Sequence, residues 1–175
     1  LETRYENKTS VLYRVDARTG AATPFYSPVA LEFALAALPA MPRDVAKRAA
    51  QNTSALRLDD SDRRALFEIA GDLYVYDFAS GNCARVTEND REIRTDATIA
   101  PDGRHVAYVV KNDLYIAAVD YVNGAAATPR RVTSDGSASV FNGRLDWVYE
   151  EELYGRGNTL GYRWSPDGRR LAFLR

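Results

Sequence analysis

Three segments of this chain resemble one another, and internal repetition constrains a fold more strongly than any other sequence feature. Each segment opens with a short polar turn and continues with an apolar run. In the first two segments a second polar turn and a second apolar run follow. The segments cover residues 62–77, 101–116 and 166–173, and residues 12–16 resemble the second run more faintly. The chain is therefore built from copies of one short unit.

Turn chemistry predicts that each unit contains a pair of strands. The triplet Pro-Asp-Gly occurs at residues 101–103 and again at 166–168. In such a turn proline presets φ, aspartate binds the local amides, and glycine accepts a positive φ. Two-residue polar turns that suit a β-hairpin follow at residues 71–72 and 112–113. Both apolar runs of a unit are therefore expected to pair as antiparallel strands.

The spacing between copies is typical of propeller blades. Leu73 and Leu114 hold the same place in two copies and lie 41 residues apart. A third strand is predicted after each pair, at residues 84–87 and 130–133. A period near ~40 residues with about four short strands per repeat indicates a β-propeller. We therefore predict an all-β fold, a partial β-propeller of about three to four blades, with residues 1–175 as the N-terminal part of the propeller domain. A β-sandwich with unrelated hairpins is the alternative.

Two segments interrupt this β pattern. Residues 28–52 are rich in helix formers, and Pro42 fits the first turn of a helix, so helical or irregular structure is expected there. The second interruption precedes the third copy. Pro166 follows Pro101 by 65 residues instead of 41, which indicates an insertion of 24 residues. Long insertions in repeat arrays often carry function.

The composition excludes several classes of function. The 175 residues include 23 basic and 24 acidic side chains, for a net charge of −1, so no overall field favours nucleic acid. The longest apolar stretch, 28–41, contains Glu32 and is too short to span a bilayer. Cys83 is the sole cysteine, which excludes an intrachain disulfide and a cysteine-based zinc site. We expect no metal and no cofactor.

A catalytic centre is not expected within these residues. The chain has no Gly-x-Ser-x-Gly nucleophile elbow. Its one histidine, His105, falls in a predicted strand of the repeat and is interpreted as a structural position. No catalytic triad can therefore be assembled here. Trp147 and Trp164 are expected to pack in the core rather than to stack on a ligand.

The insertion contains a dense run of acids between Gly143 and Gly155. The intervening residues are long enough for about three helical turns. In such a helix Glu152 lies within an otherwise apolar stripe, because side chains three and four residues apart share a face. The apolar members of that stripe are Leu145, Val148, Tyr149 and Leu153. A carboxylate beside apolar groups is unfavourable unless it has a partner.

Two interpretations of the adjacent acids Glu151 and Glu152 stay open from the residues alone. They form either a solvated charge run on a short surface helix or a binding site for a cation. Neighbouring carboxylates repel each other until a positive group arrives. An ammonium has three donors, which two carboxylates can satisfy with charge-assisted hydrogen bonds. A peptide amine, a lysine side chain and a metal ion would each fit this description.

Longer motifs place these acids in a known context. Residues 146–152 read Asp-Trp-Val-Tyr-Glu-Glu-Glu, and residues 161–168 read Gly-Tyr-Arg-Trp-Ser-Pro-Asp-Gly. The combination resembles the propeller segment of the dipeptidyl peptidase IV family, serine peptidases of the prolyl oligopeptidase type. The resemblance covers most of residues 56–175. It implies that Glu151 and Glu152 bind the N-terminal ammonium of a peptide substrate.

One departure from the family pattern concerns an arginine. The resemblance implies an additional arginine, from an earlier blade, that holds a backbone carbonyl of the substrate. It is expected shortly before Leu73, where residues 65–70 contain no arginine. Either another residue supplies this group or the carbonyl is bound differently.

The resemblance also implies the wider function. This part of the chain would gate substrates for a dipeptidyl aminopeptidase that removes N-terminal dipeptides, such as X-Pro or X-Ala, from peptides. The expected partners are a peptide with a free N-terminus and a downstream α/β-hydrolase domain that carries the catalytic triad. Homodimerisation and export to the bacterial periplasm or cell envelope are further expectations. The alternatives are a non-catalytic propeller that binds proteins and a periplasmic scaffold.

Overall fold

The computed structural model describes residues 1–175 apart from 7–8 and 89–91. Most regular structure in the described residues is antiparallel β-sheet, arranged as one three-stranded, two four-stranded and one two-stranded sheet. Within every sheet the neighbouring strands are consecutive in sequence, so each sheet is a simple meander. The fold is therefore rich in β-structure, as expected. The number of propeller blades stays a prediction.

The strands follow the repeat units along the chain. The first sheet contains β1 (Glu2–Glu6), β2 (Thr9–Val15) and β3 (Ala22–Pro24). The second contains β4 (Arg57–Leu58), β5 (Arg64–Ile69), β6 (Asp72–Asp77) and β7 (Cys83–Arg85). The third contains β8 (Thr95–Ile99), β9 (His105–Val110), β10 (Asp113–Ala118) and β11 (Arg130–Arg131). The fourth contains β12 (Tyr162–Trp164) and β13 (Leu171–Phe173). Each four-stranded sheet thus includes one complete repeat unit.

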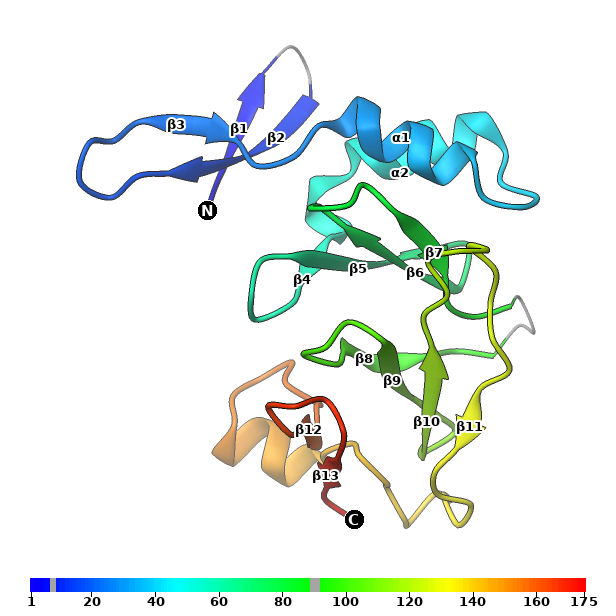
Figure 1. Ribbon diagram of the computed structural model, residues 1–175. Coiled ribbons are helices and arrows are strands. Elements are labelled where there is room, and N and C mark those ends of the chain that lie inside the picture. The colour runs from blue at the N-terminus through cyan, green and yellow to red at the C-terminus, as the bar shows by residue number, and fades with distance from the viewer. Residues whose placement is uncertain (7–8, 89–91) are drawn as a thin grey trace.

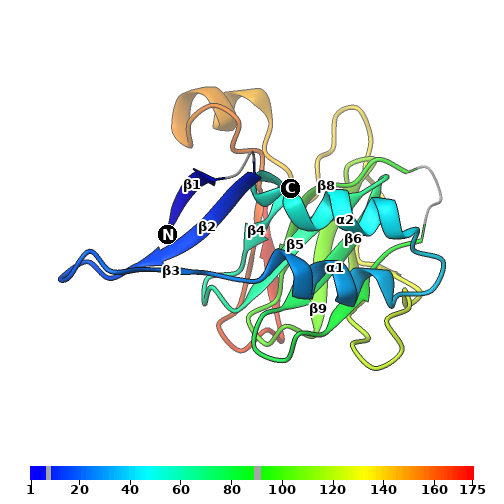
Figure 2. The same ribbon diagram turned by 90° about the horizontal axis from the view of Figure 1, so that it is seen from above.

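Two helices confirm the helical structure expected over residues 28–52. They are α1 (Pro28–Ala36) and α2 (Arg43–Gln51), and a short 3-10 helix, η1 (Thr53–Ala55), leads from α2 towards β4. The Ser27 Oγ atom accepts a hydrogen bond from the Ala30 N–H group at 3.2 Å and so caps α1. The two helices lie together over one face of the second sheet (Figures 1 and 2).

Alternating side chains bury both faces of each four-stranded sheet. In β6, Tyr74 and Tyr76 face the two helices, whereas Leu73 and Val75 face the third sheet. Successive side chains of a strand point to opposite faces, so a strand that is covered on both sides reads as a continuous apolar run. The helices, the sheet β4–β7, the sheet β8–β11 and the pair β12–β13 form successive layers, with a hydrophobic core between neighbouring layers (Figure 1).

One aspartate, one arginine and one threonine form a polar clasp at the hairpin end of the second sheet. The Thr87 Oγ1 atom accepts a hydrogen bond from the Leu73 N–H group at 3.0 Å and donates one to Asp72 Oδ1 at 3.2 Å. Arg85 donates to the other carboxylate oxygen of Asp72 at 2.5 Å and to the Thr87 carbonyl oxygen at 3.0 Å. The buried carboxylate is therefore neutralised and hydrogen-bonded, as burial of a charge requires.

The third sheet repeats this Asp-Arg-Thr clasp. Thr133 Oγ1 accepts a hydrogen bond from the Leu114 N–H group at 3.0 Å and donates one to Asp113 Oδ1 at 2.8 Å. Arg131 donates to Asp113 Oδ2 and, at 2.9 Å, to the Thr133 carbonyl oxygen. The clasp also explains why β7 and β11 are shorter than the third strands predicted at 84–87 and 130–133. The threonine side chain replaces its backbone carbonyl as the partner of the leucine N–H group.

Arg64 links the second sheet to the third. Its Nη1 atom donates to Asp59 Oδ2 at 3.1 Å and to the Pro101 carbonyl oxygen at 3.4 Å, and its Nε atom lies 3.3 Å from Asp77 Oδ2. Gly103, in the first Pro-Asp-Gly turn, has a φ of +72°, and a Cβ atom there would lie 2.1 Å from Arg64 Nε. Glycine is therefore required at this turn both for its backbone conformation and for the close approach of the arginine.

We expect the substitution Thr133→Val to lower the free energy of unfolding by about 1–3 kcal/mol. The substitution preserves the size of the side chain but deprives the Leu114 N–H group and Asp113 Oδ1 of a partner. Urea denaturation of the protein measures the effect. The matched control is Thr128→Val at an exposed threonine, which should change stability by less than about 0.5 kcal/mol. Equal stabilities of the two variants would contradict a stabilising role for the clasp.

The protein should also lose stability in acid through Asp113. Burial raises the pKa of this carboxyl, but hydrogen bonds from Arg131, Thr133 and the Gly136 N–H group outweigh burial and hold the pKa below its ordinary value. A lowered pKa in the folded state stabilises the protein above the unfolded-state pKa, and this stabilisation is lost as pH falls through the folded-state value. Stability should therefore decline below about pH 4.

The measurement for Asp113 is thermal unfolding over a series of pH values, in the wild type and in Asp113→Asn. The amide cannot be protonated in this range, so the variant should lose less stability than the wild type between about pH 5 and the acid limit of folding. An acid-induced loss as steep in Asp113→Asn as in the wild type would show that other carboxyl groups determine the acid response.

Candidate functional site

The insertion before the third repeat leaves the third sheet through a narrow, hydrogen-bonded base. Residues Arg144 and Leu160 form an antiparallel bridge. The Leu145 N–H group donates to the Thr159 carbonyl oxygen at 2.8 Å, and the Gly161 N–H group donates to the Gly143 carbonyl oxygen at 3.0 Å. The outgoing and returning arms of the insertion are therefore fixed to each other where they leave the layered core. Figure 2 shows the helix of the insertion projecting at the edge of the stacked sheets.

The helix of the insertion is shorter than predicted and includes a π-helical turn, η2 (Tyr149–Leu153). Asp146 caps its N-terminus, because Oδ1 accepts hydrogen bonds from the N–H groups of Val148 at 3.0 Å and Tyr149 at 3.1 Å. Only residues 147–153 are helical, so the expectation of about three turns is wrong. The Tyr154 N–H group donates to the Tyr149 carbonyl oxygen at 2.9 Å, a wide turn that ends at Gly155, where φ is +87°.

The predicted apolar stripe is not buried as a unit. Leu145, at the base, is buried, but Val148, Tyr149 and Leu153 are exposed. The expectation that Trp147 packs in the core is wrong, because 70% of its surface is exposed. The helix stands on the base of the insertion and has few packing contacts, so side-chain spacing alone could not determine which face is covered.

The three consecutive glutamates have different surroundings. Glu150 Oε1 accepts a hydrogen bond from the Gly157 N–H group at 3.0 Å. Glu151 Oε2 forms an ion pair with Arg156 Nε at 2.7 Å. No hydrogen bond or ion pair to Glu152 occurs within the part of the chain that the structure describes. Glu151 therefore retains one uncommitted oxygen, and the Glu152 carboxylate is open to a ligand.

Arg156 was not assigned a role from the sequence. It lies on the loop that returns from the helix, five residues beyond its partner Glu151, and 85% of its side-chain surface is exposed. The turn at Gly155 and the hydrogen bond from Gly157 to Glu150 bring this loop back over the acids. A basic residue shortly after a helix-ending glycine is the sequence feature that could have indicated the pair.

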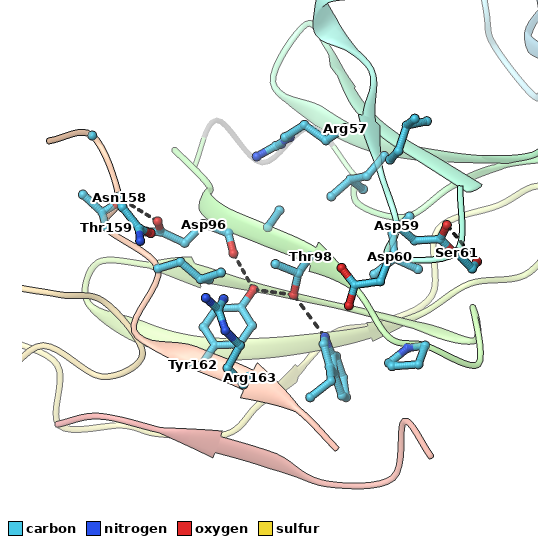
Figure 3. A pocket seen from close by; sticks show the side chains of 18 residues that line it. Arg57, Asp59, Asp60, Ser61, Asp96, Thr98, Asn158, Thr159, Tyr162 and Arg163 are labelled. Atoms are coloured by element: carbon cyan, nitrogen blue, oxygen red, sulfur yellow. Dashed lines mark hydrogen bonds between the residues drawn. The ribbon is translucent and has the colours of Figure 1, made fainter. Parts of the chain in front are cut away.

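A cavity of about 750 Å³ lies beside the returning arm of the insertion (Figure 3). Its lining comes from residues 57–61 around β4, Leu66 of β5, residues 96–99 and Pro101 around β8, and residues 157–160 and 162–164 of the returning arm and β12. Its charged side chains have both signs, with Arg57 and Arg163 on one hand and Asp59, Asp60 and Asp96 on the other. The second, third and fourth sheets thus share one hollow beside the returning arm of the insertion.

Tyr162 ties the wall of this cavity to the core. Its hydroxyl donates to the Ala107 carbonyl oxygen at 2.7 Å and accepts a hydrogen bond from Thr98 Oγ1 at 3.1 Å. Trp164 Nε1 donates to the same Thr98 Oγ1 atom at 3.0 Å (Figure 3). Burial raises the pKa of the Tyr162 hydroxyl well above its usual range, so this group stays neutral. Trp164 is only partly buried, in contact with the core between the third and fourth sheets.

Comparison with known proteins shows to which family the chain belongs. A family profile for the dipeptidyl peptidase IV N-terminal region matches residues 50–175. The chain belongs to the dipeptidyl peptidase IV family. Among curated relatives, dipeptidyl peptidase 4 of Trichophyton tonsurans is 37% identical over 102 residues, and dipeptidyl aminopeptidase B of Saccharomyces cerevisiae is 38% identical over 108 residues. These alignments cover 58% and 60% of this chain but 12% of each relative.

Solved structures of the dipeptidyl peptidase IV family share the fold. Porphyromonas gingivalis dipeptidyl peptidase 4 aligns with a TM-score of 0.62 and 25% identity over 98% of this chain and 23% of that chain. A Bacteroides ovatus structure described as a putative dipeptidyl aminopeptidase IV aligns with a TM-score of 0.57 and 23% identity over 94% of this chain and 20% of that chain. The resemblance inferred from the acidic motif is therefore confirmed.

Within residues 1–6, 9–88 and 92–175, no group of three or more His, Cys, Asp or Glu side chains is placed to hold a metal ion. Burial raises the pKa of the Cys83 thiol to about 12, which keeps the sulfur protonated and unreactive. None of the described helices combines the length and the apolar character needed to cross a membrane. His105 begins β9, as predicted for a strand position.

The base of the insertion should not tolerate a side chain at Gly161. A Cβ atom there would lie 2.9 Å from the backbone N and C atoms of Arg144 and from the Gly143 carbonyl carbon. Since backbone cannot move aside as a side chain can, Gly161→Ala should lower the free energy of unfolding by about 1–3 kcal/mol. It should also speed hydrogen exchange at the Leu145 amide, which is bonded across this base. Unchanged stability and exchange in Gly161→Ala would show that the base is loosely packed.

Proposed function

We propose that this chain is the substrate-gating part of a dipeptidyl aminopeptidase, in which Glu151 and Glu152 bind the free N-terminal ammonium of a peptide. The proposal rests on one observation above all. Two adjacent carboxylates project on an anchored insertion, and neither has its full complement of partners in the described part of the chain. The relatives named dipeptidyl peptidases and dipeptidyl aminopeptidase support the type of substrate.

A peptide ammonium matches the donors that this pair needs. The free oxygen of Glu151 and the oxygens of Glu152 are acceptors only, and an ammonium has three N–H donors and no acceptor. Hydrogen bonds between two charged groups are about twice as strong as neutral ones. The α-amino group has a pKa of about 7.7–8.0, so a large share of it carries the positive charge near neutral pH. An acylated N-terminus lacks that charge and would not be held.

Arg156 and Gly157 prepare the pair for this role. Arg156 holds one oxygen of Glu151, and the Gly157 N–H group holds Glu150, so the helix and its returning loop are joined side by side. Glu150 thereby forms a hydrogen bond with the loop, and its two neighbours are left to bind the ligand. A site that is already arranged before the ligand arrives loses less entropy on binding.

In this proposal the ammonium site determines which peptide bond of the substrate is cleaved. With the N-terminus fixed on Glu151 and Glu152, the length of an extended peptide determines which bond reaches the nucleophile. In the proposed enzyme that bond follows the second residue, so dipeptides are released. Binding energy at a point remote from the reacting bond is then used to orient that bond. We propose that the cavity beside the returning arm receives part of the substrate.

The remaining parts of the function belong to the same proposal. A partial propeller built from the layered sheets serves as the gate, and the catalytic triad lies in a downstream α/β-hydrolase domain. X-Pro and X-Ala sequences are the proposed substrates. Homodimerisation and export to the periplasm or cell envelope stay predictions.

The deciding experiment measures release of p-nitroaniline from Gly-Pro-p-nitroanilide by the complete enzyme. Glu151→Gln and Glu152→Gln preserve the shape of each side chain and remove its charge. Each should lower kcat/KM by at least about tenfold, equivalent to about 1.4 kcal/mol, without loss of folding. The N-acetylated substrate should not be hydrolysed by the wild type, because its amine carries no charge.

Glu150→Gln is the matched control for these substitutions. It changes the third member of the same triplet, and its amide oxygen can still accept the hydrogen bond from Gly157. Its kcat/KM should stay within about twofold of the wild-type value. Unchanged turnover in both Glu151→Gln and Glu152→Gln would refute the ammonium site. No turnover by the wild type would instead favour the non-catalytic propeller that binds proteins.

A further inference from the structure

Asp96 has an unusual conformation for a residue inside a strand. Its φ is +55°, a left-handed value that is uncommon for residues with a Cβ atom, although aspartate adopts it more readily than most. It lies in β8 at a break in the pairing with β9, where the register shifts between Thr95 and Thr98. Strained residues of this kind persist only where the surrounding contacts hold them, and they concentrate at functional sites.

The contacts of Asp96 explain what holds it. Its Oδ1 atom accepts a hydrogen bond from Thr159 Oγ1 at 2.5 Å, and its carbonyl oxygen competes with that of Ala107 for the single proton of the Tyr162 hydroxyl. Figure 3 shows the Asp96 side chain directed towards Thr159 across the edge of the cavity. The Oδ2 atom is buried and has no hydrogen-bond partner among the described residues. The left-handed backbone thus directs the carboxylate to the returning arm of the insertion, although one oxygen stays unsatisfied.

Thr159 connects that carboxylate to the acidic helix. Its carbonyl oxygen accepts the hydrogen bond from Leu145, on the outgoing arm, and its hydroxyl donates to Asp96. From Thr159 the returning arm leads back to Gly157 and Arg156, which bond to Glu150 and Glu151. A continuous series of contacts therefore joins the third sheet to the acids of the insertion.

We propose that Asp96 is a positioning residue, which sets the placement of Glu151 and Glu152 through its hydrogen bond with Thr159. The inference rests on the proposed function. The acidic helix is short and exposed, so the arms of the insertion determine where its carboxylates stand. The Asp96–Thr159 hydrogen bond joins a side chain of the returning arm to β8, which lines the cavity. Loss of this bond lets the returning arm shift and misplaces the ammonium site.

The test compares Thr159 variants of the complete enzyme with Gly-Pro-p-nitroanilide as substrate. Thr159→Val matches threonine in size and lacks the hydroxyl, and Thr159→Ala lacks it without adding bulk. Both should lower kcat/KM by about tenfold, because a misplaced ammonium orients the scissile bond less well. Thr159→Ser keeps the hydroxyl and should restore the wild-type kcat/KM. Thr128→Val, at an exposed threonine elsewhere, should leave kcat/KM unchanged.

The outcomes separate this inference from the proposed function. A wild-type kcat/KM in both Thr159→Val and Thr159→Ala, while Glu151→Gln lowers kcat/KM, would overturn the positioning role and leave the ammonium site in place. A kcat/KM unaffected by Glu151→Gln and Glu152→Gln would overturn the proposed function itself. A failure of Thr159→Ser to restore kcat/KM would also overturn the positioning role. Thermal unfolding of each variant shows that the compared proteins are folded.

Discussion

Burial of both faces of the four-stranded sheets is the constraint on which the rest of the structure depends. β5, β6 and β9 present large apolar side chains on both sides, for example Phe67 towards the helices and Leu66 towards the next sheet. A sheet with two apolar faces is stable only when a further layer covers each of them. The helices therefore cover the second sheet from one side, and the other sheets stack against it from the other (Figure 1).

The same burial determines how charge is distributed in the protein. Inside the layers, carboxylates such as Asp72 and Asp113 are held by an arginine and a threonine in the Asp-Arg-Thr clasp, because an unpaired charge there is strongly unfavourable. Outside the layers, Glu151 and Glu152 stand on an insertion whose base alone is packed. Carboxylates that are fully satisfied by their own protein serve stability. Those left with open acceptor positions are available to a ligand.

The sequence predicted the parts of this structure that depend on local chemistry. The Pro-Asp-Gly triplets, the hairpin turns and the apolar runs determine the paired strands, and the helix formers after Pro42 predict α2. The clasp was not predicted, because it joins residues such as Asp113 and Thr133 that meet only when the strands are folded in register. The exposure of the apolar stripe of the insertion was not predicted, for a related reason. Helical spacing defines a face, but only the neighbouring layers decide whether that face is covered.

The candidate site shows the same division between local and long-range information. The acids were found from the run of residues 146–152, which is a local pattern. Their supports come from distant positions. Asp96 contacts Thr159 across 63 residues, and Tyr162 reaches back to the carbonyl oxygen of Asp96.

Such contacts produce no periodic pattern in a single sequence. In the sequence, an aspartate that adopts a left-handed φ within a strand cannot be distinguished from any other polar strand residue. Yet an exposed pair of acids can select a ligand only if the position of the two carboxylates is fixed. The groups that make Glu151 and Glu152 useful to a ligand are therefore those that the motif itself does not contain, and they lie in the strained, incompletely satisfied wall of the neighbouring sheet.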